Sequence, residues 1–115
     1  MAKQYTWYKI DAENLIVAEQ EIITVDVNGK TICCTQYQSQ LYAFAYKCPH
    51  ASGIMADGFI DNDGNAVCPI HRYRFSVKNG YNSSGEGYYL KTYPIEKRED
   101  GVYIGMEKSG LFGWL

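Results

Sequence analysis

The stretch CPHASGIMADGFIDNDGNAVCPIHRYRF, residues 48–75, decides how this chain is organised. It begins with Cys48-Pro49-His50 and reaches Cys68-Pro69-Ile70-His71 near its end, so each motif places one thiol close to one imidazole. These are the only two histidines in the chain. Thiolates and imidazoles are ligands that suit iron and zinc, so the stretch predicts a metal site assembled from two loops.

The residues before this stretch have the composition of antiparallel strands. We expect strands over residues 3–10, 21–27, 31–37 and 41–47, and a polar loop with room for one helical turn over 11–20. Asn28-Gly29 predicts a tight hairpin, because both central residues of a type I′ turn need positive φ. The first part of the chain is therefore expected to be a β-meander.

The residues after the stretch continue this pattern. A Ser/Gly loop is expected over 82–87, a strand over 88–97 with Pro94 near its edge, and a hairpin from Asp100-Gly101 into 102–106. No segment has a convincing helical period. The fold class predicted is all-β: a small antiparallel sandwich or barrel in one domain, residues 1–115. Residues 48–76 are expected to form a loop subdomain inserted into a base formed by 1–47 and 77–115.

Composition excludes several classes of protein. The chain has 115 residues, 46% of them hydrophobic and 21% charged, which fits one folded domain. Its net charge of −2, with no basic stripe, argues against nucleic acid as a partner. No apolar run is long enough to cross a membrane, and residues 1–9 lack the apolar region of an export signal. We therefore expect a cytoplasmic protein whose cysteines serve a metal rather than disulfides.

Two kinds of metal site fit this set of candidate ligands. Structural zinc sites of the Cys₂His₂ type usually group like ligands, whereas the order here is Cys, His, Cys, His. In addition, a single residue separates Cys48 from His50, which leaves little room for both side chains to bind the same ion. A [2Fe–2S] cluster with both cysteines on one iron and both histidines on the other suits the order better. A zinc-stapled interaction module remains the alternative.

The sequence resembles the Rieske iron–sulfur family. The resemblance rests on both ligand motifs, on Met55-Ala56-Asp57-Gly58 and on Arg74-Phe75, and the flanking strands extend it over most of the chain. The chain looks most like the small Rieske-type ferredoxins of bacterial oxygenase systems. This implies one [2Fe–2S] cluster per chain, with one iron held by Cys48 and Cys68 and the other by His50 and His71.

The resemblance also implies a function. The protein is expected to be a soluble one-electron carrier, not an enzyme, that passes electrons from a flavin-dependent reductase to a terminal oxygenase. It cannot itself be the oxygenase, because that would need further histidines for a mononuclear iron. The alternative is the small subunit of an NADH-dependent nitrite reductase, which shares the fold.

The reduction potential is expected to lie low in the Rieske range. Two ferric ions, two sulfides, two thiolates and two neutral imidazoles sum to zero charge. A cluster with this charge is easier to reduce than a cluster held by four thiolates. High-potential relatives add a disulfide, which would fall at Gly53 and Ile70, and hydroxyl groups at the positions of Tyr73 and Phe75. Because these positions offer few donors to the sulfurs, we expect roughly −150 mV rather than +300 mV.

Two positions depart from the family pattern. Arg72 stands where a Gly normally follows the second histidine, so the turn after His71 is expected to differ, and residues 82–87 lack the Pro that often covers the cluster.

Other residues allow two interpretations each. Cys33 and Cys34 point to opposite faces of a strand, which predicts one buried and one half-exposed thiol, or else a redox or additional ligand role. Ile54 and Met55 are expected to pack under the ligand loop and to add an apolar rim. The remaining features could each contact a partner or be ordinary surface and packing: the cations Lys47, Arg72, Arg74 and Lys78, and the tail with Phe112 and Trp114.

Overall fold

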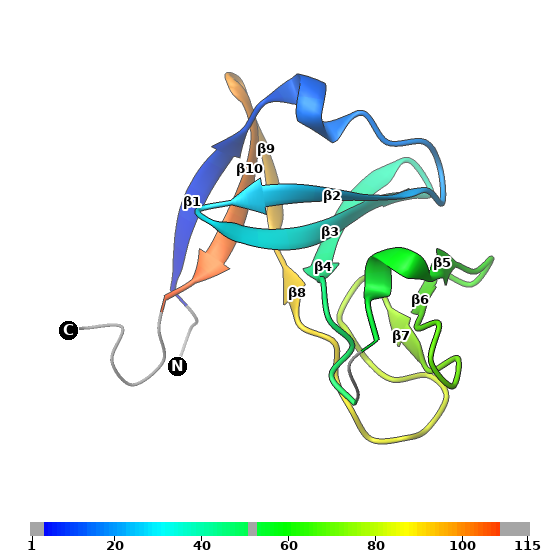
Figure 1. The fold of residues 1–115 in the computed structure, drawn as a ribbon. Helices are drawn as coiled ribbons and strands as arrows, with labels where there is room; N and C mark the ends of the chain where they lie inside the picture. The colour runs from blue at the N-terminus through cyan, green and yellow to red at the C-terminus, as the bar shows by residue number, and fades with distance from the viewer. Residues whose placement is uncertain (1–3, 51–52, 109–115) are drawn as a thin grey trace.

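The computed structural model describes residues 4–50 and 53–108 and confirms the all-β, antiparallel fold class. Three sheets contain all ten strands of this part of the chain (Figure 1). Its helical segments are two short 3₁₀ turns, Ala12–Leu15 and Met55–Asp57. Within the same residues, no helix is long and apolar enough to cross a membrane.

The first sheet joins the two ends of the described chain. Strand β1 (Tyr5–Ile10) pairs with β10 (Gly101–Glu107), which pairs in turn with β9 (Ile95–Arg98). Tyr5 lies opposite Glu107 and Ile10 opposite Val102, so the pairing runs along the whole of β1. The predicted hairpin at Gly101 is confirmed.

The second sheet is the predicted meander. It has the order β2 (Ile22–Val27), β3 (Lys30–Tyr37), β4 (Gln40–Ala45) and β8 (Thr92–Tyr93). Asn28 and Gly29 have φ values of 50° and 80°, which confirms the hairpin between β2 and β3. We expected one strand over 88–97, and this was wrong: Pro94 separates β8 from β9, and the two belong to different sheets.

The third sheet is small and carries the ligand loops. It consists of β5 (Phe59–Ile60), β6 (Asn65–Val67) and β7 (Arg74–Ser76), drawn in green in Figure 1. The segment after β7 bends back against it, since Phe75 and Asn82 form a bridge. Gly80, with φ of 78°, makes this return possible, because a Cβ there would lie 1.9 Å from the Leu90 carbonyl oxygen.

Two hydrophobic cores share strand β3. One lies between the first two sheets and includes Val27, Ile32, Cys34 and Ile104. The other lies between the second sheet and the ligand loops, and its members are Cys33, Tyr37, Phe44, Cys48, Met55, Ile60, Ala66, Cys68, Phe75, Val77 and Leu90. The cysteines of both ligand motifs therefore belong to the second core.

Candidate metal centre

The two ligand motifs sit in loops that backbone hydrogen bonds close. In the first loop the Cys48 amide donates to the Gly53 carbonyl at 2.8 Å, just beyond the end of β4. In the second loop Cys68 follows β6 directly, and its amide donates to the Tyr73 carbonyl at 2.9 Å. Each cysteine thus stands at the start of a loop fixed at its base, which holds its side chain in place.

Three of the four predicted ligands come together. The Sγ atoms of Cys48 and Cys68 and a ring nitrogen of His50 all lie within 4.8 Å of one another. Cys48 Sγ and His50 Nδ1 are 2.5 Å apart, and both cysteines are buried. His71 lies outside this group but next to it, with its ring centroid 5.9 Å from that of His50.

The residues present fit an iron–sulfur centre. Two thiols and two imidazoles from two loops are a donor set suited to iron. Gly53 keeps the space beside the sulfur open, because a Cβ at that position would approach Cys68 Sγ to 2.8 Å. The same Cβ would lie 3.4 Å from Ile70 Cδ1, so the two positions at which high-potential relatives carry a disulfide are neighbours, and neither offers a sulfur here.

Aromatic rings surround the first histidine. The Tyr73 ring stacks on the His50 ring at 3.8 Å between centroids and 27° between planes. Tyr88 approaches the same pair, at 5.8 Å from His50 and 6.1 Å from Tyr73. Tyr88 was not foreseen as a site residue, and no motif around it indicates one.

The turn after the second histidine keeps a shape that suits glycine. His71 and Arg72 have φ values of 62° and 55°, in the left-handed region that side chains with a Cβ seldom adopt. Arg72 thus takes the backbone conformation that a Gly would adopt without strain, at a local cost in conformational free energy. The missing Gly adds backbone strain to this turn.

Asn82 organises the loop that lacks a proline. Its side-chain amide donates to the Arg74 carbonyl at 3.1 Å and to Ser84 Oγ at 3.2 Å, and its Oδ1 accepts from the amides of Glu86 and Gly87 (3.3 Å for Gly87). Ser84 in turn accepts from the Arg74 amide at 3.0 Å. A hydrogen bond from the Ser84 hydroxyl lowers the pKa of the Glu86 carboxyl. Sequence reasoning missed Asn82, although an Asn ahead of Ser and Gly is typical of such side-chain turns.

The cysteine pair on β3 is buried on both faces, so the prediction of one half-exposed thiol was wrong. Cys33 and Cys34 are each 0% exposed, since each face of β3 is covered by one of the two cores. Burial raises the pKa of each thiol to about 12. Thiols that do not ionise near neutral pH are poor ligands and poor nucleophiles, so neither suits a redox role.

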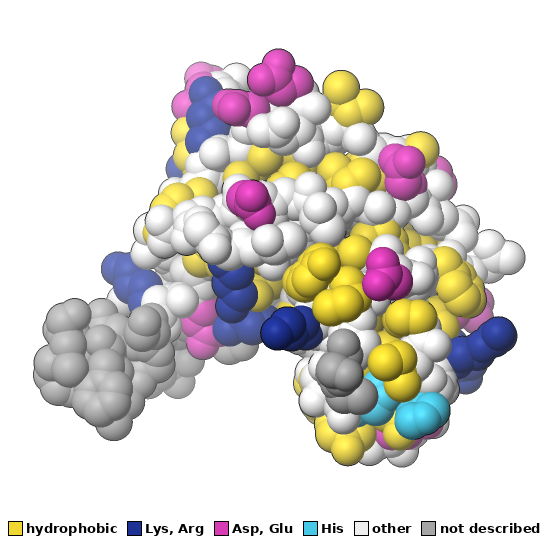
Figure 2. All heavy atoms as spheres, viewed as in Figure 1, with side chains coloured by type: hydrophobic (Ala, Val, Ile, Leu, Met, Phe, Trp, Pro, Cys, Tyr) yellow, Lys and Arg dark blue, Asp and Glu magenta, His cyan; other side chains and the backbone are white. Residues whose placement is uncertain are grey.

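The surface around the histidines differs from the expected rim in one respect. Met55 packs under the loop as predicted but is 0% exposed, so it forms no rim. Ile70, in the second loop, is 37% exposed instead. In Figure 2 the histidines lie among hydrophobic side chains near one end of the molecule. The predicted flanking cations are all exposed: Lys47, Arg72, Arg74 and Lys78. The tail with Phe112 and Trp114 lies outside the described residues.

Comparison with known proteins agrees with this geometry. Residues 6–94 match the Rieske [2Fe-2S] domain. The ferredoxin component of naphthalene 1,2-dioxygenase/salicylate 5-hydroxylase systems from Ralstonia sp is 32% identical over 93 residues, which cover 79% of this chain and 88% of that protein.

Solved structures have the same fold. A chain in the complex of reduced oxygenase and oxidized ferredoxin in carbazole 1,9a-dioxygenase superposes with a TM-score of 0.74 at 26% identity, covering 90% of this chain and 95% of that one. The putative NADH-dependent nitrite reductase small subunit from Mycobacterium tuberculosis gives 0.72 at 16% identity, over 90% and 96% of the two chains, a likeness of fold alone. With its ligand motifs, its two-loop site and its match over residues 6–94, the chain belongs to the Rieske [2Fe-2S] domain family and carries one such cluster.

Proposed function

We propose that Cys48 and Cys68 hold one iron of the [2Fe–2S] cluster and that His50 and His71 hold the other. The closeness of the first three donor groups supports this assignment. We also propose that residues 48–76 form the cluster-binding subdomain and that 1–47 and 77–115 form its base. The separate sheet β5-β6-β7 supports that division.

The protein is proposed to act as a one-electron carrier that receives electrons from a flavin-dependent reductase and delivers them to a terminal oxygenase. When bound, the cluster takes up and releases one electron at a time. The chain's own residues set where this happens: the buried cysteines keep one side of the site inside the second core, while His71 and Ile70 stand at the surface. The observation that carries the proposal is this exposed imidazole beside a thiol-rich core.

The relatives support the choice of acceptor. Relatives that match in sequence include ferredoxin components of naphthalene dioxygenase and alkene monooxygenase systems. One of the superposable structures is a ferredoxin in complex with its oxygenase. We place the protein in the cytoplasm, where its neighbouring buried thiols Cys33 and Cys34 would stay reduced.

The test begins with the protein as purified. Iron and sulfide in equal amounts, with a Rieske-type optical and EPR spectrum, are expected. Zinc in place of iron and sulfide would indicate a zinc-stapled interaction module rather than an electron carrier. The reduced protein is then mixed with oxygenases and with a sirohaem nitrite reductase, and oxidation by an oxygenase alone is expected.

The same sample gives the reduction potential. Phe75 is fully buried and has no hydroxyl, and Gly53 and Ile70 supply no disulfide, so these three positions offer the sulfurs no side-chain hydrogen-bond donor. A redox titration followed by EPR is expected to give roughly −150 mV, and a clearly positive midpoint would contradict this account.

A further inference from the structure

The chain contains two Asn-Gly pairs, Asn28-Gly29 and Asn79-Gly80, and both lie in turns. An asparagine followed by glycine can lose its side-chain amide without an enzyme, because glycine has no Cβ to shield its backbone nitrogen from the preceding side chain. The reaction also requires that this nitrogen is free and that the backbone around it can rotate. The structure gives the two pairs opposite surroundings in both respects.

Asn28-Gly29 is the open pair. It forms the tip of the hairpin between β2 and β3, and both residues are exposed. Within residues 4–50 and 53–108, no hydrogen bond of a turn or side chain involves the Asn28 side chain or the Gly29 amide. A Cβ added to Gly29 would meet nothing within 4 Å, so the space beside the nitrogen is empty. An exposed tip of this kind changes its backbone angles at little cost in free energy.

Asn79-Gly80 is the closed pair. The Gly80 amide donates to the Ser76 carbonyl at 2.8 Å, and Asn79 Oδ1 accepts from the Tyr81 amide at 2.9 Å. Gly80 is also buried, and its backbone packs so closely that a Cβ there would lie 1.9 Å from the Leu90 carbonyl oxygen. To react, this pair would have to break both hydrogen bonds and leave its packing, which makes the reaction slow in the folded protein.

We propose that Asn28 is a site of spontaneous deamidation and isomerisation, and that the fold protects Asn79 from the same reaction. The Gly29 nitrogen bonds to the side-chain carbonyl carbon of Asn28, and the side-chain amide leaves with the Gly29 hydrogen as ammonia. One water then opens the resulting succinimide ring. Opening at the side-chain carbonyl carbon gives aspartate, and opening at the backbone carbonyl carbon gives isoaspartate, in which the chain runs through the former side chain.

Isoaspartate disrupts the hairpin in which it forms. The connection between β2 and β3 is a turn of two residues, since Val27 pairs with Lys30. Isoaspartate adds one carbon atom to the backbone, and a two-residue type I′ turn has no place for it. Val27 and Ile32, near this turn, are 1% and 0% exposed and belong to the core of the base. In Figure 1 the turn lies at the end of β2 and β3 that points away from the sheet β5-β6-β7, so the loosening is expected in the base and not at the ligand loops.

The first test compares the two asparagines in one sample. The purified holoprotein is incubated in warm, mildly alkaline buffer, since the attacking nitrogen must lose its proton, and peptide mass spectrometry follows the mass change at each site. Asn28 is expected to convert several-fold faster than Asn79. A sample unfolded in guanidinium is the control, and its two sites are expected to convert at similar rates. Equal rates in the folded protein, or an unreactive Asn28 while the unfolded chain reacts, would overturn the proposal.

The second test identifies the product. A protein isoaspartyl methyltransferase with a labelled methyl donor is expected to label the peptide that contains residue 28, and an unlabelled peptide would contradict the isomerisation. Asn28→Asp is the matched variant, because it carries the added charge on an unaltered backbone. Hydrogen exchange over residues 22–37 is expected to speed up several-fold in the aged protein and to stay close to that of the parent in freshly prepared Asn28→Asp. An equal increase in both would assign the effect to charge and overturn the disruption of the hairpin.

Discussion

The base of the molecule and its ligand-loop region are stabilised in different ways. The strands of the base, β1–β4 and β8–β10, have up to eight residues and pair along their length around an aliphatic core. The loop region, residues 46–50 and 53–91, adds to the proposed cluster-binding subdomain the segments that flank it; its strands have two or three residues, and side-chain hydrogen bonds and buried thiols contribute to its stability. The base is therefore expected to fold by hydrophobic burial alone, whereas we expect the loop region to depend on its metal as well as on its share of the second core.

The largest expected effect tests this difference directly. Cys68→Ser removes a thiol from the core of the loop region, and the variant is expected to retain no cluster, because the site loses one of its two sulfur ligands. Iron analysis and the visible spectrum measure the loss. Hydrogen exchange is expected to speed up over residues 53–91 while the base strands stay protected.

Cys34→Ala is the control for that experiment. Cys34 is equally buried but belongs to the core of the base, so the variant is expected to keep its iron. If hydrogen exchange sped up equally in both regions of Cys68→Ser, the two parts would be one cooperative unit.

The next effect concerns the base alone. Ile104→Ala creates a cavity at a fully buried position between the first two sheets, and it is expected to lower the free energy of unfolding by about 2–5 kcal/mol. Chemical denaturation of the cluster-loaded protein measures the change. Ile16→Ala, at a residue 78% exposed, is expected to stay within about 0.5 kcal/mol of the parent, and a similar loss at both sites would contradict the burial argument.

A smaller effect is expected in the loop region. Asp61 Oδ1 accepts hydrogen bonds from the amides of Asp63 and Asn65, both at 2.9 Å, and so shapes the turn between β5 and β6. Asp61→Ala is expected to cost about 1–3 kcal/mol and to loosen the loop region before the base, as hydrogen exchange would measure. The exposed neighbour Asp63 provides the control: Asp63→Ala is expected to be close to neutral.

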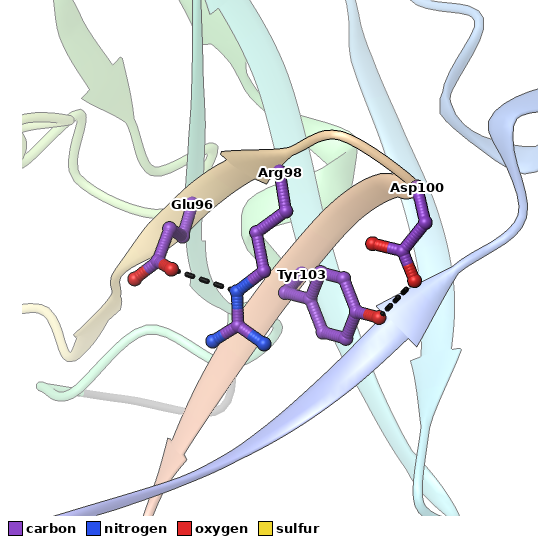
Figure 3. Close-up of polar contacts among 4 residues, drawn as sticks. All are labelled: Glu96, Arg98, Asp100 and Tyr103. Atoms are coloured by element: carbon purple, nitrogen blue, oxygen red, sulfur yellow. Dashed lines mark hydrogen bonds and ion pairs between the residues drawn. The ribbon is translucent and has the colours of Figure 1, made fainter.

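The smallest effect lies at the far hairpin of the base, shown in Figure 3. The Tyr103 hydroxyl donates to Asp100 Oδ2 at 2.7 Å, and this bond lowers the pKa of the Asp100 carboxyl. A lowered folded-state pKa contributes stability above the carboxyl's ordinary pKa, and this contribution is lost as the pH falls through the folded-state value. Tyr103→Phe is therefore expected to raise the pKa of Asp100 toward its ordinary value.

NMR titration of the carboxyl measures that change. Tyr42→Phe, which removes a hydroxyl bonded to Gln40 instead, is the control and is expected to leave Asp100 unchanged. Arg98 also lies in this cluster, with its guanidinium 4.1 Å from the Tyr103 ring and its Nε 2.7 Å from Glu96 (Figure 3). A pKa of Asp100 that did not respond to Tyr103→Phe would assign the shift to the charges of Lys9, whose Nζ lies 3.9 Å from Asp100 Oδ2, and Arg98 instead.

The base was largely predictable from the sequence, because local signals set it. Asn28-Gly29 and Gly101 mark the hairpins, and strand composition marks most of the strands. The segment around Pro94 was not predicted correctly, since its strand composition is continuous on both sides. Which sheet each half joins depends on tertiary pairing: Ala43 pairs with Tyr93 and Ile104 with Ile95.

The sequence predicts the candidate ligands of the site but not their surroundings. Cys48, His50 and Cys68 follow from motif spacing, and the structure places their donor atoms together. The contact of Tyr88 with His50 could not be inferred, because the two residues are far apart in the chain and only the fold of the 80–90 segment brings them together. The burial of Cys33 and Cys34 likewise depends on the presence of a second core, which no local sequence pattern indicates.

That double burial bears on how the cluster is assembled. The chain has four sulfhydryl groups, and iron delivered to an unfolded chain could bind any pair of them. Once both cores have formed around β3, Cys33 and Cys34 are enclosed and burial raises the pKa of their thiols, so the two loop sulfurs remain to receive the metal. We therefore expect that iron supplied after the base has folded meets only the sulfurs of the ligand loops, so that folding before metallation limits incorrect metal binding.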